Sequence, residues 1–382
     1  MGILITCMGS VVILIYVVVF IRYGNALLSA QGSVHTSKAI GSVKVSVIIP
    51  VRNEFYSLPL LIDDLDKQNY LQENYEVIFV NDHSNDGSET YLIEICQSRM
   101  NFSFCSLDSG FLGKKQAIDK GCSIAKGDWI IQTDADCRLP SGFISGHADL
   151  AFAGKAGLIA GPVLTESGKG MWCSLESIEM MSLTGTGMAS FLLGRPVMCS
   201  GANLSYNKAF YMEVREEVLK VPSASGDDMF LLMQAKKLDK GMAYLNSFEH
   251  LVTTSLNGSI YSFISQRVRW GSKARFYSDR DLLFLSMVVW LTNAIITLYL
   301  VGSFFIPLLL PFFLASWIIK SGVDFRVLYL VARIFRRTRQ LRWFPLAALF
   351  YYFYVTVAGL LAMYGKYSWK DRTYYCETKS HP

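Results

Sequence analysis

The stretch from Val43 to Pro50 reads VKVSVIIP, and it decides the fold class. Its β-branched residues, ending at a proline, predict a strand that is buried on both faces of a sheet. Similar runs follow at 75–80 (YEVIFV), 102–106 (FSFCS) and 128–133 (DWIIQT), and segments with helical spacing separate them at 56–68, 89–99 and 115–124. Strands that alternate with helices predict an α/β domain with a mostly parallel sheet, covered by helices on both faces.

Polar residues follow three of these strands directly. They are the segments 52–54, 81–86 and 134–136. In parallel α/β sheets, ligands bind beyond the carboxyl ends of the strands. The sequence therefore predicts a functional site where these three segments meet.

The chain is more apolar than an ordinary soluble protein, with 52% hydrophobic and 18% charged residues, against about 25% charged in typical globular chains. The excess lies in three runs without a charged residue, at 1–21, 282–319 and 344–364. A bilayer span needs about 20 apolar residues, and the second run is long enough for a hairpin of two spans. The alternatives are buried core helices and, for the first run, a cleaved signal peptide, although no basic residue precedes it.

These runs divide the chain into seven segments. We expect an N-terminal transmembrane anchor at 1–22, a linker at 23–42, a cytoplasmic catalytic domain at 43–281, a transmembrane hairpin at 282–319, an amphipathic interfacial segment at 320–343, a transmembrane helix at 344–364 and a tail at 365–382.

Basic residues flank the predicted spans, which indicates that the central domain faces the cytoplasm. The tail contains Lys366, Lys370 and Arg372, which a count of four spans leaves on the outside, so the topology of the last span stays open. The arginine-rich segment 320–343 is typical of a helix on an anionic membrane surface, or else of a solvated loop helix. The net charge of +5 is explained by the membrane rather than by nucleic acid.

Acidic residues stand at the predicted strand ends. Asp134 and Asp136 are two residues apart and could face one hard cation, Mg²⁺ or Mn²⁺, that keeps open positions for a diphosphate. Asp82 could accept hydrogen bonds from a base or ribose. The alternatives are a strand end with capping carboxylates and an ordinary polar turn.

Two further motifs carry candidate chemistry. Asp227 and Asp228 precede an apolar helix, which they could simply cap, or one of them could be a general base. Gln266, Arg269 and Trp270 share a helix face at i, i+3 and i+4. They could bind phosphate oxygens or belong to a basic juxtamembrane helix. The segment 171–193 has amphipathic spacing, which fits a membrane-surface helix or core packing.

The order of motifs resembles the family 2 glycosyltransferases, which are inverting, membrane-associated enzymes with the GT-A fold. Seven segments carry the resemblance in the family's order and spacing: SVIIPVRNE (46–54), FVNDHSNDGS (79–88), GKKQAIDKG (113–121), TDADC (133–137), CSGANLSYNKAFY (199–211), GDDMFLL (226–232) and QRVRW (266–270). Each segment is weak alone, but together they displace the separate structural alternatives.

The resemblance implies a role for each matched position. It implies nucleotide-sugar binding by Pro50, Glu54, Asp82, Lys114 and Asp134, metal binding by Asp136, general-base catalysis by Asp228, and contact with the diphosphate and acceptor by Gln266, Arg269 and Trp270. Two positions depart from the family: Asn81 replaces an acid, and His83 stands where glycine is common. Both leave the nucleotide preference open.

We therefore expect an inverting transferase that moves a sugar from a UDP- or GDP-sugar to a lipid, glycan or other membrane-proximal acceptor by metal-assisted single displacement. It would work at the cytoplasmic face of a bacterial inner membrane. A processive polysaccharide synthase is one alternative. A catalytically silent scaffold or a transporter is another, although a transporter is expected to place charged residues in its spans and the three apolar runs have none.

Overall fold

The computed structural model describes residues 2–30, 43–154, 156–222, 226–257, 259–364, 366–369 and 372–375. Most of the predicted linker, from residue 31, and the tail from residue 376 lie outside these ranges. The chain divides into two compact units. The α/β unit comprises 32–166 and 198–255, and the helical unit comprises 1–31, 167–197 and 256–382.

The α/β unit is built on a seven-stranded sheet in the order β3-β2-β1-β4-β8-β6-β9. Its strands are β1 Val45–Val51, β2 Tyr75–Asn81, β3 Phe102–Ser106, β4 Trp129–Gln132, β6 Leu158–Ala160, β8 Leu204–Asn207 and β9 Met242–Tyr244. Neighbouring strands are parallel except at β8, which is antiparallel to β4 and β6. The predicted mostly parallel sheet is confirmed. A small second sheet joins β5 Cys137–Arg138, β7 Val163–Thr165 and β10 Val252–Thr254.

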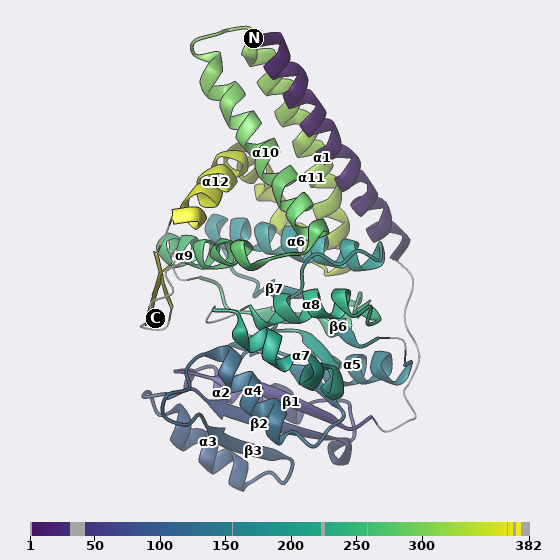
Figure 1. Ribbon diagram of the computed structural model, residues 1–382, viewed down its shortest axis with the longest axis vertical. Helices are drawn as coiled ribbons and strands as arrows, with labels where there is room; N and C mark the ends of the chain where they lie inside the picture. The colour runs from purple at the N-terminus through teal and green to yellow at the C-terminus, as the bar shows by residue number, and fades with distance from the viewer. Residues whose placement is uncertain are drawn as a thin grey trace. The chain divides into compact units, whose positions relative to one another are not determined.

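Helices cover both faces of the large sheet (Figure 1). They are α2 Leu58–Asp66, α3 Ser88–Gln97, α4 Lys114–Ile124, α5 Phe143–Phe152, α7 Lys208–Lys220 and α8 Asp227–Lys237. Alternate residues of β1 face opposite sides, as the period of a strand requires. Val45, Val47 and Ile49 join the core with α2 and α5.

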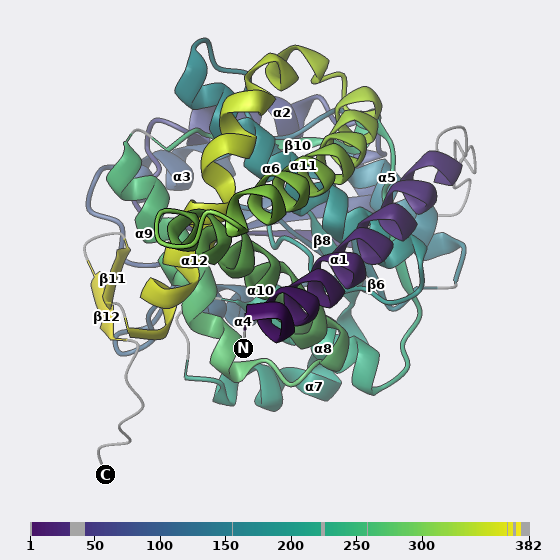
Figure 2. The same ribbon diagram turned by 90° about the horizontal axis from the view of Figure 1, so that it is seen from above.

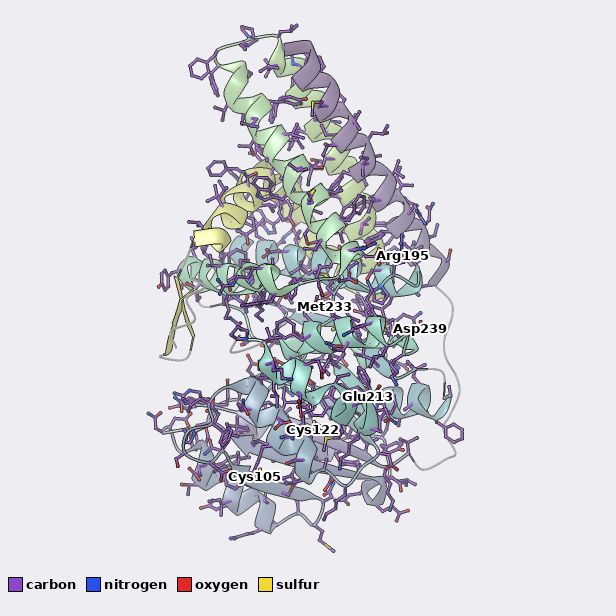
Figure 3. The ribbon with its side chains drawn as sticks, viewed as in Figure 1. Cys105, Cys122, Arg195, Glu213, Met233 and Asp239 are labelled. Carbon is purple, nitrogen blue, oxygen red and sulfur yellow. The ribbon has the colours of Figure 1, made fainter. Side chains whose placement is uncertain are left out.

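Ile48 faces α4 on the other side of the sheet. A Cβ at Gly121 of α4 would lie 2.5 Å from the Ile48 Cγ2, so glycine is what lets this helix approach the strand. One residue further on, the buried Cys122 (Figure 3) contacts the Tyr206 hydroxyl of β8, with 3.7 Å between Sγ and Oη. Close packing of α4 fixes its first residue, Lys114, at the carboxyl end of the sheet.

The helical unit contains α1 Gly2–Ala30, α6 Met171–Leu192, α9 Ile260–Gly271, α10 Arg280–Ser303, α11 Leu309–Ile334, α12 Phe344–Tyr364 and a hairpin of β11 Lys366–Trp369 and β12 Arg372–Tyr375. Among the described residues, three segments are long and apolar enough to cross a membrane: Met8–Ala30, Arg280–Ser303 and Thr338–Leu361. The helix α1 packs on α6, α10 and α11, and α12 packs on α9 and α10 (Figure 2).

Two predicted boundaries fall inside helices of the structure. The helix α1 continues eight residues past 22, into the predicted linker. The helix α11 runs through 319/320, so the first half of the predicted interfacial segment is no separate helix. Lys320 and Asp324 lie inside α11 and form an ion pair with each other. Asp324 also accepts a hydrogen bond from Tyr16 of α1 at 2.6 Å.

The predicted domain 43–281 is not one compact unit. The helices α6 and α9 group with the terminal helices because they pack against α1, α11 and α12. Half of the amphipathic α6 is buried by these contacts, including Ile178, Met181 and Met188.

Candidate functional site

The loops that follow β1 and β2 are tied together at the carboxyl end of the sheet. The Arg52 guanidinium donates from Nη1 to the backbone carbonyls of Asp82 at 2.7 Å and His83 at 3.3 Å. Asp82 is 2% exposed, and its Oδ2 accepts from the backbone N–H of Gly113 at 3.0 Å. The structure thus joins three of the predicted motifs, those around 52, 82 and 113.

The two departures from the family pattern have structural explanations. His83 has φ 55°, a left-handed conformation that favours glycine. Its ring lies 3.2 Å from the Phe111 carbonyl, measured from Nε2. The buried Asn81 amide donates to Glu89 at 3.2 Å and Ser106 at 3.4 Å, so it braces the turn from inside.

Pro50 and Glu54 lie at the end of β1, beside this turn. Pro50 is opposite Val80 in the parallel ladder. The Glu54 backbone N–H donates to Ser88 Oγ at 3.0 Å, and its Oε2 accepts from Ser57 Oγ at 3.0 Å. Glu54 is therefore held at the start of α2, on the same edge of the sheet as Asp82.

Lys114 lies among three carboxylates. Its ammonium forms an ion pair with Asp134, and their side chains are 17% and 36% exposed. Burial opposes the charge of Lys114, but the charges of Asp134, Asp227 and Asp228 outweigh it and raise its pKa above the ordinary value. The structure thus brings the motifs at 114, 134 and 227–228 together around one cation.

The two acids of the GDD motif have different environments. Asp227 is 3% exposed and accepts a hydrogen bond from Gln132 Nε2 at 2.8 Å. Burial raises its pKa, while the charge of Lys114 acts in the opposite direction.

Asp228 is half-buried, and it accepts from the backbone N–H of Gly201 at 3.0 Å and of Met229 at 2.8 Å. The N-cap of α8 is Gly226, without a side-chain hydrogen bond, so Asp228 lies in the first turn and is not the cap of the helix. An ionised carboxylate has about four lone-pair positions, so each oxygen retains capacity for a ligand. A base at this position would be held rigidly by two backbone donors.

Asp136 follows β4 and is half-buried, with its Oδ1 3.8 Å from the Cys137 thiol. The described residues contain no group of three or more His, Cys, Asp or Glu side chains that could hold a metal ion. A cation here would be held by Asp136 and by oxygens of a bound diphosphate, the mode in which Mg²⁺ is commonly bound in enzymes. The donor set fits that mode.

Gln266, Arg269 and Trp270 lie on α9, in the helical unit. Their neighbour Arg267 is buried and pairs with Glu179 of α6, at 2.5 Å between Nη2 and Oε2. The Arg267 guanidinium also lies 3.9 Å from the Phe263 ring centroid and 4.8 Å from that of Trp270. The predicted contact of this motif with a diphosphate stays a prediction.

Gln266 is fixed from two directions. Its Oε1 accepts from Arg267 Nη1 and from Asn257 Nδ2 at 3.2 Å. Asn257 is in turn held by Glu176 of α6, to which its backbone N–H donates at 3.0 Å. Glu176, Glu179 and Arg267 were not predicted from the sequence because charged residues in amphipathic helices usually face solvent.

Comparison with known proteins shows which family one part of the chain resembles. Residues 46–215 match the sequence profile described as Glycosyl transferase family 2. This part of the chain, just under half of its length, is similar to family 2 glycosyltransferases. The match covers the strands β1, β2 and β4 and every candidate residue from Pro50 to Asp136.

Two relatives of this chain have the same recorded name, undecaprenyl-phosphate 4-deoxy-4-formamido-L-arabinose transferase. The one from Photorhabdus laumondii is 40% identical over 98 residues, and the one from Proteus mirabilis is 39% identical over 98 residues. Each match covers 25% of this chain and 30% of the relative.

A solved structure of mannosyltransferase PcManGT from Pyrobaculum calidifontis, in complex with GDP-Man and Mn²⁺, is similar over 94% of this chain and 97% of that one. Its TM-score is 0.56 at 16% identity, which establishes likeness of fold. The expected GT-A fold, with apolar helices near both ends of the chain, is confirmed.

Proposed function

We propose that this protein transfers a sugar from a nucleoside-diphosphate donor, a UDP- or GDP-sugar, to a phosphorylated membrane lipid, with inversion at the anomeric carbon. The observation that carries the proposal is the cluster of Asp134, Asp227 and Asp228 around Lys114 at the carboxyl end of the sheet. The names of both relatives pair sugar transfer with undecaprenyl phosphate. Three candidate spans agree with an acceptor in the membrane.

The charge of the cluster supports metal assistance. Three carboxylates surround one ammonium, so the site repels a diphosphate unless another cation enters with it. Mg²⁺ or Mn²⁺ held by Asp136 would supply that charge and stabilise the leaving diphosphate. Asp134 would contact the donor. Lys114, which is paired with Asp134, would also bind oxygens of the donor's diphosphate.

The remaining residues would bind the donor and prepare the acceptor. Asp82 and Glu54, beside Pro50, would hold the nucleoside. Asp228, fixed by two backbone N–H groups, would take the proton of the acceptor oxygen as that oxygen attacks. Gln266, Arg269 and Trp270 would contact the diphosphate and the acceptor. The site would work at the cytoplasmic face of a bacterial inner membrane.

A donor screen tests the proposal. Membranes with the full-length protein are given radiolabelled UDP- and GDP-sugars with Mg²⁺ or Mn²⁺, and released nucleoside diphosphate and labelled lipid are measured. We expect one donor to give equal amounts of diphosphate and lipid-extractable label. Label in precipitable polymer would instead identify a polysaccharide synthase, and no turnover with any donor would contradict a transferase.

A further inference from the structure

The turn between α11 and α12 concentrates positive charge at one end of a candidate span. It contains four arginines within seven residues, Arg336, Arg337, Arg339 and Arg342, and a short 3₁₀ helix, η4 Thr338–Trp343. We call residues 336–343 the arginine turn. It packs on α6, α11 and α12 within the helical unit.

Arg337 differs from the other arginines of the turn. The side chains of Arg336, Arg339 and Arg342 are exposed, whereas Arg337 is half-buried and its buried Nε has no hydrogen-bond partner. No carboxylate pairs with its guanidinium in the part of the chain that the structure describes. Burial alone lowers the pKa of Arg337, which is what a cation without a counter-charge undergoes.

Two buried cations of the helical unit have carboxylate partners. Arg267 pairs with Glu179, and Lys320 pairs with Asp324. A buried charge is normally paired or bonded because its desolvation is costly. The exception at Arg337 therefore points to an anion that binds there.

Two more polar atoms of the turn are buried without partners. They are the indole N–H of Trp343, a donor, and Oε1 of Gln340, an acceptor. The backbone is also held in an uncommon conformation, since Arg336 has φ 56°, a region that costs a non-glycine residue energy. A guanidinium and an indole N–H are both donors that phosphate oxygens accept.

We propose that the arginine turn is a binding site for the phosphate of an anionic membrane lipid, with Arg337 and the Trp343 N–H as its donors. The lipid source follows from position, because α12 begins at Phe344, directly after the turn. Tryptophan and clustered arginine at the end of a span lie at the level of the headgroups. Gln340 Oε1 would accept a hydrogen bond from a hydroxyl-bearing headgroup such as phosphatidylglycerol.

Native mass spectrometry of the full-length protein in detergent tests this site. Phosphatidylglycerol, phosphatidylcholine and inorganic phosphate are titrated separately into wild type, Arg337→Gln and Arg339→Gln. The last variant is the matched control, since it removes the same charge from an exposed side chain of the same turn. One basic residue near an anionic surface contributes about 1 kcal/mol, so we expect Arg337→Gln to lose at least about fivefold in phosphatidylglycerol affinity, and Arg339→Gln clearly less.

Trp343→Phe provides a second variant that removes only the indole N–H and keeps the aromatic ring. It should weaken phosphatidylglycerol binding, whereas phosphatidylcholine, whose choline neutralises the charge of its phosphate, should bind weakly to the wild type and to every variant. Equal losses in Arg337→Gln and Arg339→Gln would contradict a specific site and indicate general surface charge. Saturation by inorganic phosphate at the same concentrations as the lipid would contradict a lipid site. These measurements need no turnover, so they are independent of the proposed transferase activity.

Discussion

The proposed role of Asp228 as the general base can be tested with a single substitution. Its carboxylate is held by the N–H groups of Gly201 and Met229, and the isosteric Asp228→Asn variant removes its ability to take a proton. General-base catalysis contributes about 10²–10⁴-fold, but a phosphate acceptor with a second pKa near 6 is already about one tenth deprotonated at pH 5, so we expect kcat to fall about tenfold at pH 5 with donor affinity unchanged. The measurement is initial-rate kinetics together with donor binding by calorimetry.

The pH dependence of this loss reports on the acceptor. A phosphate monoester loses its second proton near pH 6, so a phosphate acceptor needs a base below that pH and progressively less above it. The ratio of wild-type to Asp228→Asn rates should therefore fall as the pH rises from 5 to 8. A ratio near one at every pH would refute the base assignment, and a large constant ratio would indicate a hydroxyl acceptor instead.

At the scale of elements, the pair between α6 and α9 positions the motif at 266–270. The side chains of Arg267 and Glu179 are 6% and 11% exposed, and the loss of one partner of such a buried pair costs about 3–5 kcal/mol. We expect Glu179→Gln to lower thermal stability and to reduce kcat/KM at least tenfold for both the acceptor and the donor, because Gln266 and Trp270, the proposed contacts to the acceptor and the diphosphate, lose their support. Differential scanning fluorimetry and kinetics measure the two effects.

A matched control separates position from stability. Asp119→Asn breaks the pair with Arg215 in the α/β unit, where Asp119 is 10% exposed and lies 2.5 Å from the arginine Nε. It should lose stability while keeping its acceptor kinetics below its melting temperature. If both variants lose acceptor efficiency equally, the positioning role of Glu179 is wrong.

The sequence predicted the elements whose patterns are local. The strands β1, β2, β3 and β4 were predicted within two residues because apolar runs of this length are typical of buried strands. The short strands after Asp136 were not predicted, since strands of two to four residues exist only through their tertiary partners. The helix α11 was divided because Lys320 and Asp324 look like the end of a span until their mutual pairing is known.

The sequence motifs predicted the residues of the candidate site but not the contacts between them. Asp82, Lys114, Asp134 and Asp228 were found from strand ends and family resemblance, and the structure brings the last three together. Contacts between distant segments could not be read from spacing. The polar Gln132 in an otherwise apolar strand was the available signal, but its partner Asp227 lies 95 residues away.

In the whole molecule, a segment that is similar to family 2 glycosyltransferases is combined with helices long and apolar enough to cross a membrane. The apolar excess of the sequence falls in the helical unit, whereas the acids around Lys114 lie in the α/β unit. We propose that these acids, with a divalent cation at Asp136, transfer a sugar to a membrane lipid.

Metal-assisted transfer is tested by measuring how much labelled sugar enters extractable lipid with and without divalent cations. With the donor found by the screen, the full-length wild type should label lipid in Mn²⁺ or Mg²⁺, stop in EDTA and recover when the metal is restored. Asp136→Asn should lose about 10²-fold or more of the rate, since a metal contributes several kcal/mol to charge stabilisation. Lipid labelling that proceeds equally in EDTA, or in Asp136→Asn, would contradict sugar transfer assisted by a divalent cation at Asp136.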